Sequence, residues 1–151
     1  HSARSSDAER ELTQEGRKRV REVAEGLAAS KLIRSDKIAI WSSPLPRALQ
    51  TAQILSDIWG GLPVAEYDAI VRGVLDTLSA GWAHIPLDYT LVIVGHEPCL
   101  SSWNERITGV FMPFKKASAA GYTIADHHSV TGKMRWYMTA KTMARLGGAT
   151  V

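Results

Sequence analysis

The chain has 151 residues, of which 45% are apolar and 22% are charged. These values are typical of one soluble globular domain and exclude a disordered or low-complexity chain. The longest apolar runs are strand-length, far below the ~20 residues of a membrane-spanning helix, so no membrane partner is expected. The net charge of +3 is compatible with an anionic ligand. The single cysteine, Cys99, cannot form an internal disulfide, which fits a cytoplasmic location.

The first part of the chain predicts a helix, a strand and a second helix. Residues 13–29 carry an apolar stripe at helical spacing, and Thr13 is a good N-cap. Residues 37–41 read as a buried strand that feeds the loop Ser42-Ser43-Pro44. Residues 45–59 return to helical spacing, with a proline in the first turn and two glycines after the end.

The middle of the chain contains its clearest strand. Residues 63–67 predict a short strand, and residues 74–83 a weak helix. Residues 89–94 are apolar on both faces, which is typical of a buried strand in a parallel sheet with helices on each side. This strand runs directly into Gly95-His96-Glu97-Pro98, and residues 99–107 predict the helix that follows.

The end of the chain predicts a hairpin and a closing helix. Residues 119–125 and 133–138 are the two strands, residues 126–132 are polar enough for their turn, and residues 140–146 form the helix. The alternation of strands and helices over the whole chain predicts an α/β layered fold with a largely parallel sheet. Ligands of such sheets bind beyond the carboxyl ends of the strands.

Two loops at such strand ends carry side chains that suit an anion. Arg47 falls in the first turn of the second helix, where its guanidinium, the backbone N–H groups and the positive helix end all favour a phosphate. His96 follows a buried strand and can donate a hydrogen bond to an anion or move a proton. Both loops belong to one edge of the predicted sheet, so Arg47 and His96 are expected to meet in one cleft. On residue type alone, a surface arginine and a structural histidine are the alternatives.

Three motifs resemble the histidine phosphatase superfamily, and within it the SixA-type phosphohistidine phosphatases. Residues 42–52, Ser-Ser-Pro-Leu-Pro-Arg-Ala-Leu-Gln-Thr-Ala, match the second signature of the family throughout. Residues 94–98, Val-Gly-His-Glu-Pro, are similar to its second-histidine motif, and residues 9–16 to the stretch that leads the first helix. The resemblance implies a phosphoglycerate-mutase-like fold, a three-layer α/β/α sandwich, in a single domain over residues 1–151.

The resemblance also implies that His1 is the nucleophile. The family opens with a strand that ends in Arg-His, followed by Gly, Ala or Ser, whereas this sequence begins His1-Ser2-Ala3-Arg4 without that strand or its arginine. In the implied mechanism His1 attacks phosphorus, while Arg47 and His96 hold the phosphoryl oxygens. Fixed cationic donors take the role of a metal, so neither a metal nor a cofactor is expected. A remnant of a cloning tag is the alternative interpretation of His1.

The substrate implied by the resemblance is a phosphorylated protein of the phosphorelay or phosphotransfer type. A protonated imidazole leaves phosphorus without help, whereas an alkoxide leaving group needs a proton donor. Glu66 and Asp68 are candidates for such an acid, as is Glu97 beside His96, although Glu66 and Asp68 also read as ordinary loop carboxylates. A phosphomonoesterase acting on a small phosphoester or on a phosphoserine/threonine protein therefore stays open, as does a catalytically silent phosphate-binding module.

Other functional classes fit the sequence less well. Cys99 and Arg106 are separated by six residues, whereas a cysteine phosphatase needs five. No phosphate-binding loop of the Walker type occurs. His127-His128 lacks the spacing of a zinc site and reads as part of a solvated turn. Tryptophans can stack on nucleic acids, but three of them have apolar neighbours and predict core packing, so no nucleic-acid partner is expected: Trp41, Trp59 and Trp103.

Overall fold

The computed structural model describes residues 8–33, 36–126 and 129–150, so that His1 and His127-His128 lie outside the described residues. In chain order its elements are α2 (Gln14–Ser30), β1 (Ile38–Ser42), α3 (Pro46–Ile58), β2 (Val64–Glu66), α4 (Asp68–Arg72), α5 (Leu75–Trp82), β3 (Thr90–Val94), α6 (Cys99–Thr108), β4 (Ala119–Ile124), β5 (Gly132–Met138) and α7 (Ala140–Leu146). No helix within these ranges is long and apolar enough to span a membrane.

The central sheet is parallel and has the strand order β2-β1-β3. Ser42, the last residue of β1, pairs with Glu66 on one side and with Val94 on the other, so the three strands end together. The hairpin β4-β5 forms a separate antiparallel pair. Among the described residues, no strand pairs with the outer edge of β3. The predicted order of elements and the parallel sheet are confirmed.

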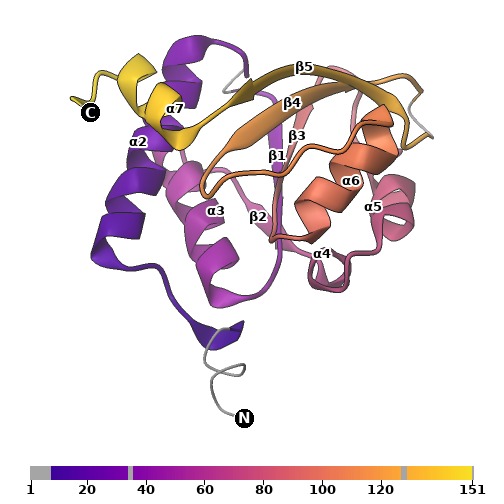
Figure 1. Cartoon of the computed structure of the whole chain (residues 1–151), viewed down its shortest axis with the longest axis horizontal. Coiled ribbons are helices and arrows are strands. Elements are labelled where there is room, and N and C mark those ends of the chain that lie inside the picture. Colours follow the sequence, from indigo (N-terminus) through magenta and orange to yellow (C-terminus); the bar gives the residue numbers. More distant parts are fainter. Residues whose placement is uncertain (1–7, 34–35, 127–128, 151) are drawn as a thin grey trace.

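Helices cover both faces of the parallel sheet, which makes the three layers visible in Figure 1. Alternate residues of β1 divide between the two faces, as the pleat of a strand requires. Ile38 and Ile40 pack in a core with α2, α3 and α7, whereas Trp41 packs in a second core with α4, α5 and α6. The residues of β3 divide in the same way between the two cores. The fold is therefore an α/β/α sandwich.

The structure differs from the sequence-based expectation at two elements. All five residues of β3 are half-buried, although a fully buried strand was predicted. The reason is the position of β3 at the edge of the described sheet, where one side of the strand has no neighbour. The helix α4 was not predicted, because five residues are too short to show a helical period. It ends at Gly73, whose φ of 72° belongs to the left-handed region.

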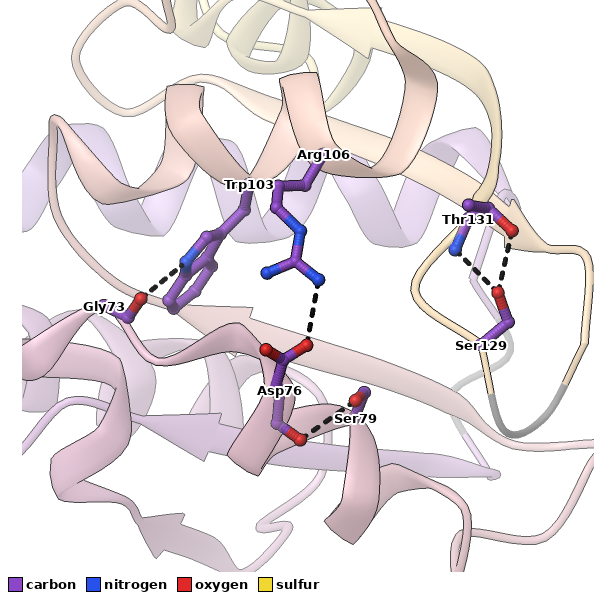
Figure 2. A network of polar contacts seen from close by, with 7 residues as sticks. All are labelled: Gly73, Asp76, Ser79, Trp103, Arg106, Ser129 and Thr131. Atoms are coloured by element: carbon purple, nitrogen blue, oxygen red, sulfur yellow. Dashed lines mark hydrogen bonds and ion pairs between the residues drawn. The ribbon is translucent and has the colours of Figure 1, made fainter.

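The buried tryptophans hold helices together, as predicted for the core. Trp41, Trp59 and Trp103 are each at most 6% exposed. The Trp59 indole N–H donates to the carbonyl of Ala24 at 2.9 Å, which joins α3 to α2. Trp103 on α6 donates to the carbonyl of Gly73 at 3.3 Å (Figure 2). Cys99 is the first residue of α6, near the helix start as expected.

A second contact joins α6 to the start of α5. The Arg106 guanidinium donates to the Asp76 carboxylate at 2.9 Å, and the Ser79 hydroxyl donates to the backbone carbonyl of Asp76 at 3.0 Å (Figure 2). Both charged side chains are largely exposed, so the ion pair adds little stability by itself. Together with Trp103, it fixes the direction of α6, which begins three residues after His96.

The close approach of α2 and α7 gives a prediction about stability. A Cβ atom on Gly26 would lie 1.8 Å from the backbone carbonyl oxygen of Met143, so no side chain fits between the two helices there. We expect Gly26→Ala to destabilise the protein by about 1–3 kcal/mol or more, since backbone atoms must move. Thermal unfolding would measure the loss. Gly16→Ala in the same helix is the control, because its nearest neighbours are side-chain atoms at 3.3 Å and beyond; equal melting temperatures for both variants would contradict the prediction.

Candidate active site

The site is built where β1 and β3 end side by side. The backbone N–H of Ser43 donates to the carbonyl of Val94 at 3.0 Å, which extends the pairing of the two strands by one residue. A Cβ atom on Gly95 would lie 3.0 Å from Ile70 and 3.3 Å from Leu100. Glycine at this position therefore lets α4 and α6 pack tightly against the loop, and this packing fixes the place of His96, the next residue.

The first turn of α3 presents unsatisfied donors beside this loop. Leu45 is the N-cap residue. No side chain in the described part of the chain caps the helix, and its first turn contains no acidic residue. The N–H of Leu45 already donates to the Ser43 hydroxyl at 3.1 Å, and Pro46 has no N–H. The positive end of the helix, including the N–H groups of the first turn, therefore remains available to an anion.

Arg47 and His96 line one cavity of about 200 Å³, together with Leu45 and Ala8. The prediction that the two loops meet is therefore confirmed by the geometry. Among the described residues, no hydrogen bond or ion pair engages the Arg47 guanidinium. A half-buried, unpaired guanidinium at a helix start is suited to bind two oxygens of a phosphate.

The surroundings of His96 favour its neutral form. Burial of the imidazole lowers the pKa of His96 below its ordinary value of 6.5, and the positive charge of Arg47 lowers it further. Its Nε2 lies 2.7 Å from the hydroxyl oxygen of Ser43. A bound anion would act in the opposite direction, because negative charge favours the imidazolium.

The carboxylates named as possible acids lie elsewhere. Glu66 is exposed at the end of β2, and Asp68 is exposed at the start of α4, 3.6 Å from Arg72. Neither lines the cavity. Glu97 is next to His96 in sequence, but its carboxylate accepts hydrogen bonds from the N–H and hydroxyl of Ser101 on α6. In the described part of the chain, no group of three or more His, Cys, Asp or Glu side chains is arranged to hold a metal ion.

Sequence reasoning missed two residues that position the site. Ser43 contacts His96 through its hydroxyl, although only its place beside the strand end was noticed. The Gln50 side chain accepts a hydrogen bond from the N–H of Leu12 at 2.7 Å, which ties the segment before α2 to α3. The same segment brings Ala8 to the cavity. Ser43 and Gln50 both belong to the signature at residues 42–52, and this motif was the signal in the sequence that could have pointed to them.

The lowered pKa of His96 predicts a pH-dependent stability. Between that lowered pKa and 6.5, the unfolded chain binds a proton at His96 and the folded chain does not. The free energy of unfolding should therefore rise with pH across this window and fall on acidification. Urea unfolding at pH 8 and pH 5.5 would measure the change for the protein and for His96→Gln. The variant should lose less stability on acidification, and an equal loss would contradict the assignment.

The fold and the site together define an α/β protein with a cleft at its strand ends that is lined by an arginine and a histidine. Comparison with known proteins identifies the family: the model of the histidine phosphatase superfamily (branch 1) matches residues 3–71. An uncharacterized protein of Picosynechococcus sp. (strain PCC 7002) is 37% identical over 125 residues, which are 78% of this chain and 73% of the relative. The chain therefore belongs to the histidine phosphatase superfamily.

A solved structure has the same fold. The structure of the protein histidine phosphatase SixA complexed with tungstate superposes with a TM-score of 0.70. The likeness covers 90% of this chain and 88% of SixA, at 21% sequence identity. The residues matched by the family model include Arg47, begin after His1 and end before His96.

Proposed function

We propose that this chain is a single-domain phosphatase that hydrolyses phosphoryl groups through a covalent phosphohistidine, with a histidine-phosphorylated protein as its substrate. The observation that carries the proposal is the pairing of Arg47 and His96 in one cavity at the open N-terminus of α3. These groups supply positive charge and hydrogen-bond donors at one point, which is what a phosphoryl group requires.

In the proposed reaction His1 is the nucleophile. A ring nitrogen of its neutral imidazole attacks phosphorus, the new N–P bond forms and the bond to the leaving group breaks. Arg47 binds two of the phosphoryl oxygens, and His96 donates to an oxygen as charge spreads over them in the transition state. Water then attacks phosphorus, inorganic phosphate leaves and His1 is regenerated. These fixed cations supply the stabilisation that a metal ion provides in other phosphatases.

The lining of the cavity supports phosphohistidine over a phosphomonoester. None of the lining residues that the structure describes, Ala8, Leu45, Arg47 and His96, carries a carboxylate that could protonate an alkoxide. A protonated imidazole leaves without such help. SixA, which shares the fold, is itself a protein histidine phosphatase. Cys99 is a free thiol, which fits a reducing compartment such as the cytoplasm, where phosphorylated signalling proteins are found.

Trapping of the intermediate tests the proposal. The protein would be mixed with a histidine-phosphorylated peptide, quenched in alkaline denaturant within milliseconds and digested for mass spectrometry. We expect an acid-labile, base-stable phosphate on His1, and inhibition of turnover by tungstate. A phosphoserine peptide run in parallel should turn over more slowly. Turnover without a phosphorylated histidine would contradict the mechanism, and phosphate binding without turnover would show a silent binding module.

A further inference from the structure

The hydroxyl of Ser43 lies between the two halves of the site. Ser43 is completely buried at the end of β1, and its backbone is held by Val94 on β3. Its hydroxyl oxygen is 3.1 Å from the N–H of Leu45 and 2.7 Å from Nε2 of His96. The buried Ser43 oxygen therefore contacts both the N-cap residue of α3, the helix that carries Arg47, and the imidazole of His96.

The donors and acceptors at this oxygen define the direction of each bond. A serine hydroxyl has one hydrogen to donate and two lone pairs to accept with. The Leu45 N–H can only donate, so it occupies one lone pair. A buried hydroxyl hydrogen without an acceptor is destabilising. Among the described residues, Nε2 of His96 is the acceptor that the Ser43 hydroxyl contacts, so the hydrogen belongs on that bond.

We propose that Ser43 is a positioning residue, which donates to Nε2 and thereby holds neutral His96 as the Nδ1–H tautomer. The tautomer of a histidine is set by the hydrogen bond at its other ring nitrogen. With Nε2 engaged by Ser43, Nδ1 is the nitrogen that keeps its proton and remains for a ligand. Histidine in water favours the opposite tautomer, Nε2–H, so the preference at His96 has to be imposed by the protein.

In this arrangement Nδ1–H can donate to a phosphate although the imidazole carries no positive charge in the empty site. This advantage rests on the proposed function. When a phosphoryl dianion binds and His96 takes up a proton, Nε2 acquires a hydrogen as well. The Ser43 oxygen then accepts from Nε2 with its second lone pair, and its own hydrogen gives up the acceptor it has in the empty site. The ring keeps its orientation through both protonation states.

Nitrogen NMR on the full chain with ¹⁵N-labelled histidine measures the tautomer directly. At a pH above its pKa, the unmodified protein should show a protonated Nδ1 and an unprotonated Nε2 for His96, assigned by its absence in His96→Gln. Ser43→Ala should shift the ring towards Nε2–H. Ser42→Ala is the matched control, because Ser42 is equally buried and its hydroxyl donates to the carbonyl of Ser43, not to His96. The Nε2–H tautomer in the unmodified protein would overturn the proposal, whether or not the variants fold.

Kinetics provide a second measurement. Ser43→Ala should lower kcat by about tenfold with little change in KM. The reason is that the His96 donor is still present in this variant but is no longer held in the orientation that the reaction needs. Its rate should also depend differently on pH from that of Ser42→Ala. Superimposable pH profiles of the two variants would overturn the positioning role. The Nδ1–H tautomer in a protein that shows no turnover would contradict the proposed phosphatase while supporting the orientation of His96 by Ser43.

Discussion

Replacing Arg47 with alanine is expected to lower kcat/KM by about 10²–10³-fold, the effect of removing one preorganised charge donor from a transition state. Arg47 is the cationic side chain that lines the cavity with His96, and no described group neutralises it. The fold should survive, since the side chain is half-buried and makes no hydrogen bond with another described residue. Steady-state kinetics with a histidine-phosphorylated peptide would measure the loss, and thermal unfolding would check the fold.

Two variants sharpen the interpretation of that result. Arg47→Lys keeps the charge but not the planar fork, so an intermediate loss is expected if bidentate contact with phosphate matters. Arg21→Ala removes an exposed arginine of α2 and should leave the rate within about twofold, because exposed charges are screened by solvent. A fully active Arg47→Ala protein would refute the assignment of Arg47 to the phosphate site.

Replacing His1 with alanine is expected to abolish turnover and the covalent label together, because no other group takes over as nucleophile. Phosphate or tungstate should still bind with an affinity close to that of the unmodified protein, since Arg47 and His96 remain. Ala8 lines the cavity, and seven residues of extended chain can reach about 25 Å, so the first residue is within range of the site. Isothermal titration calorimetry and single-turnover kinetics would measure the two properties separately.

His84→Ala is the matched control for His1→Ala. His84 is an exposed histidine after α5 that does not line the cavity, so its loss should change neither turnover nor labelling. Residual turnover in His1→Ala, with a label on another residue, would move the nucleophile elsewhere. Loss of anion binding as well as turnover would show that the first residue supports the cavity and would leave its role as nucleophile without evidence.

Much of the scaffold could be predicted because it depends on local patterns. The N-cap of α2 is an example: Thr13 accepts from the N–H of Gly16 at 3.0 Å, as its residue type indicated. Arg47 and His96 were expected to meet because parallel strands end at one edge, and they do. The resemblance to the superfamily rested on motifs around these same two residues, and the family model matches residues 3–71, which contain Arg47.

The direction of individual side chains was beyond the sequence. Glu97 adjoins His96 in the chain, yet its carboxylate turns to Ser101 on α6. Glu66 and Asp68 follow the sheet edge that bears the site, yet both face solvent. The Ser43 hydroxyl instead became a partner of His96 through a contact across 53 residues. Such contacts depend on side-chain rotamers and on packing between distant elements, and neither can be recognised from the spacing of residues in a sequence.

The outer edge of β3, with which no described strand pairs, leads directly into the loop that carries His96. A strand edge carries backbone donors and acceptors that another strand can pair with, and β3, with five residues, is a longer edge than the three-residue β2. A strand added in parallel beside β3 would finish level with Val94, because parallel strands in register end together. The carboxyl end of such a strand would lie on the side of the sheet that carries the His96 loop.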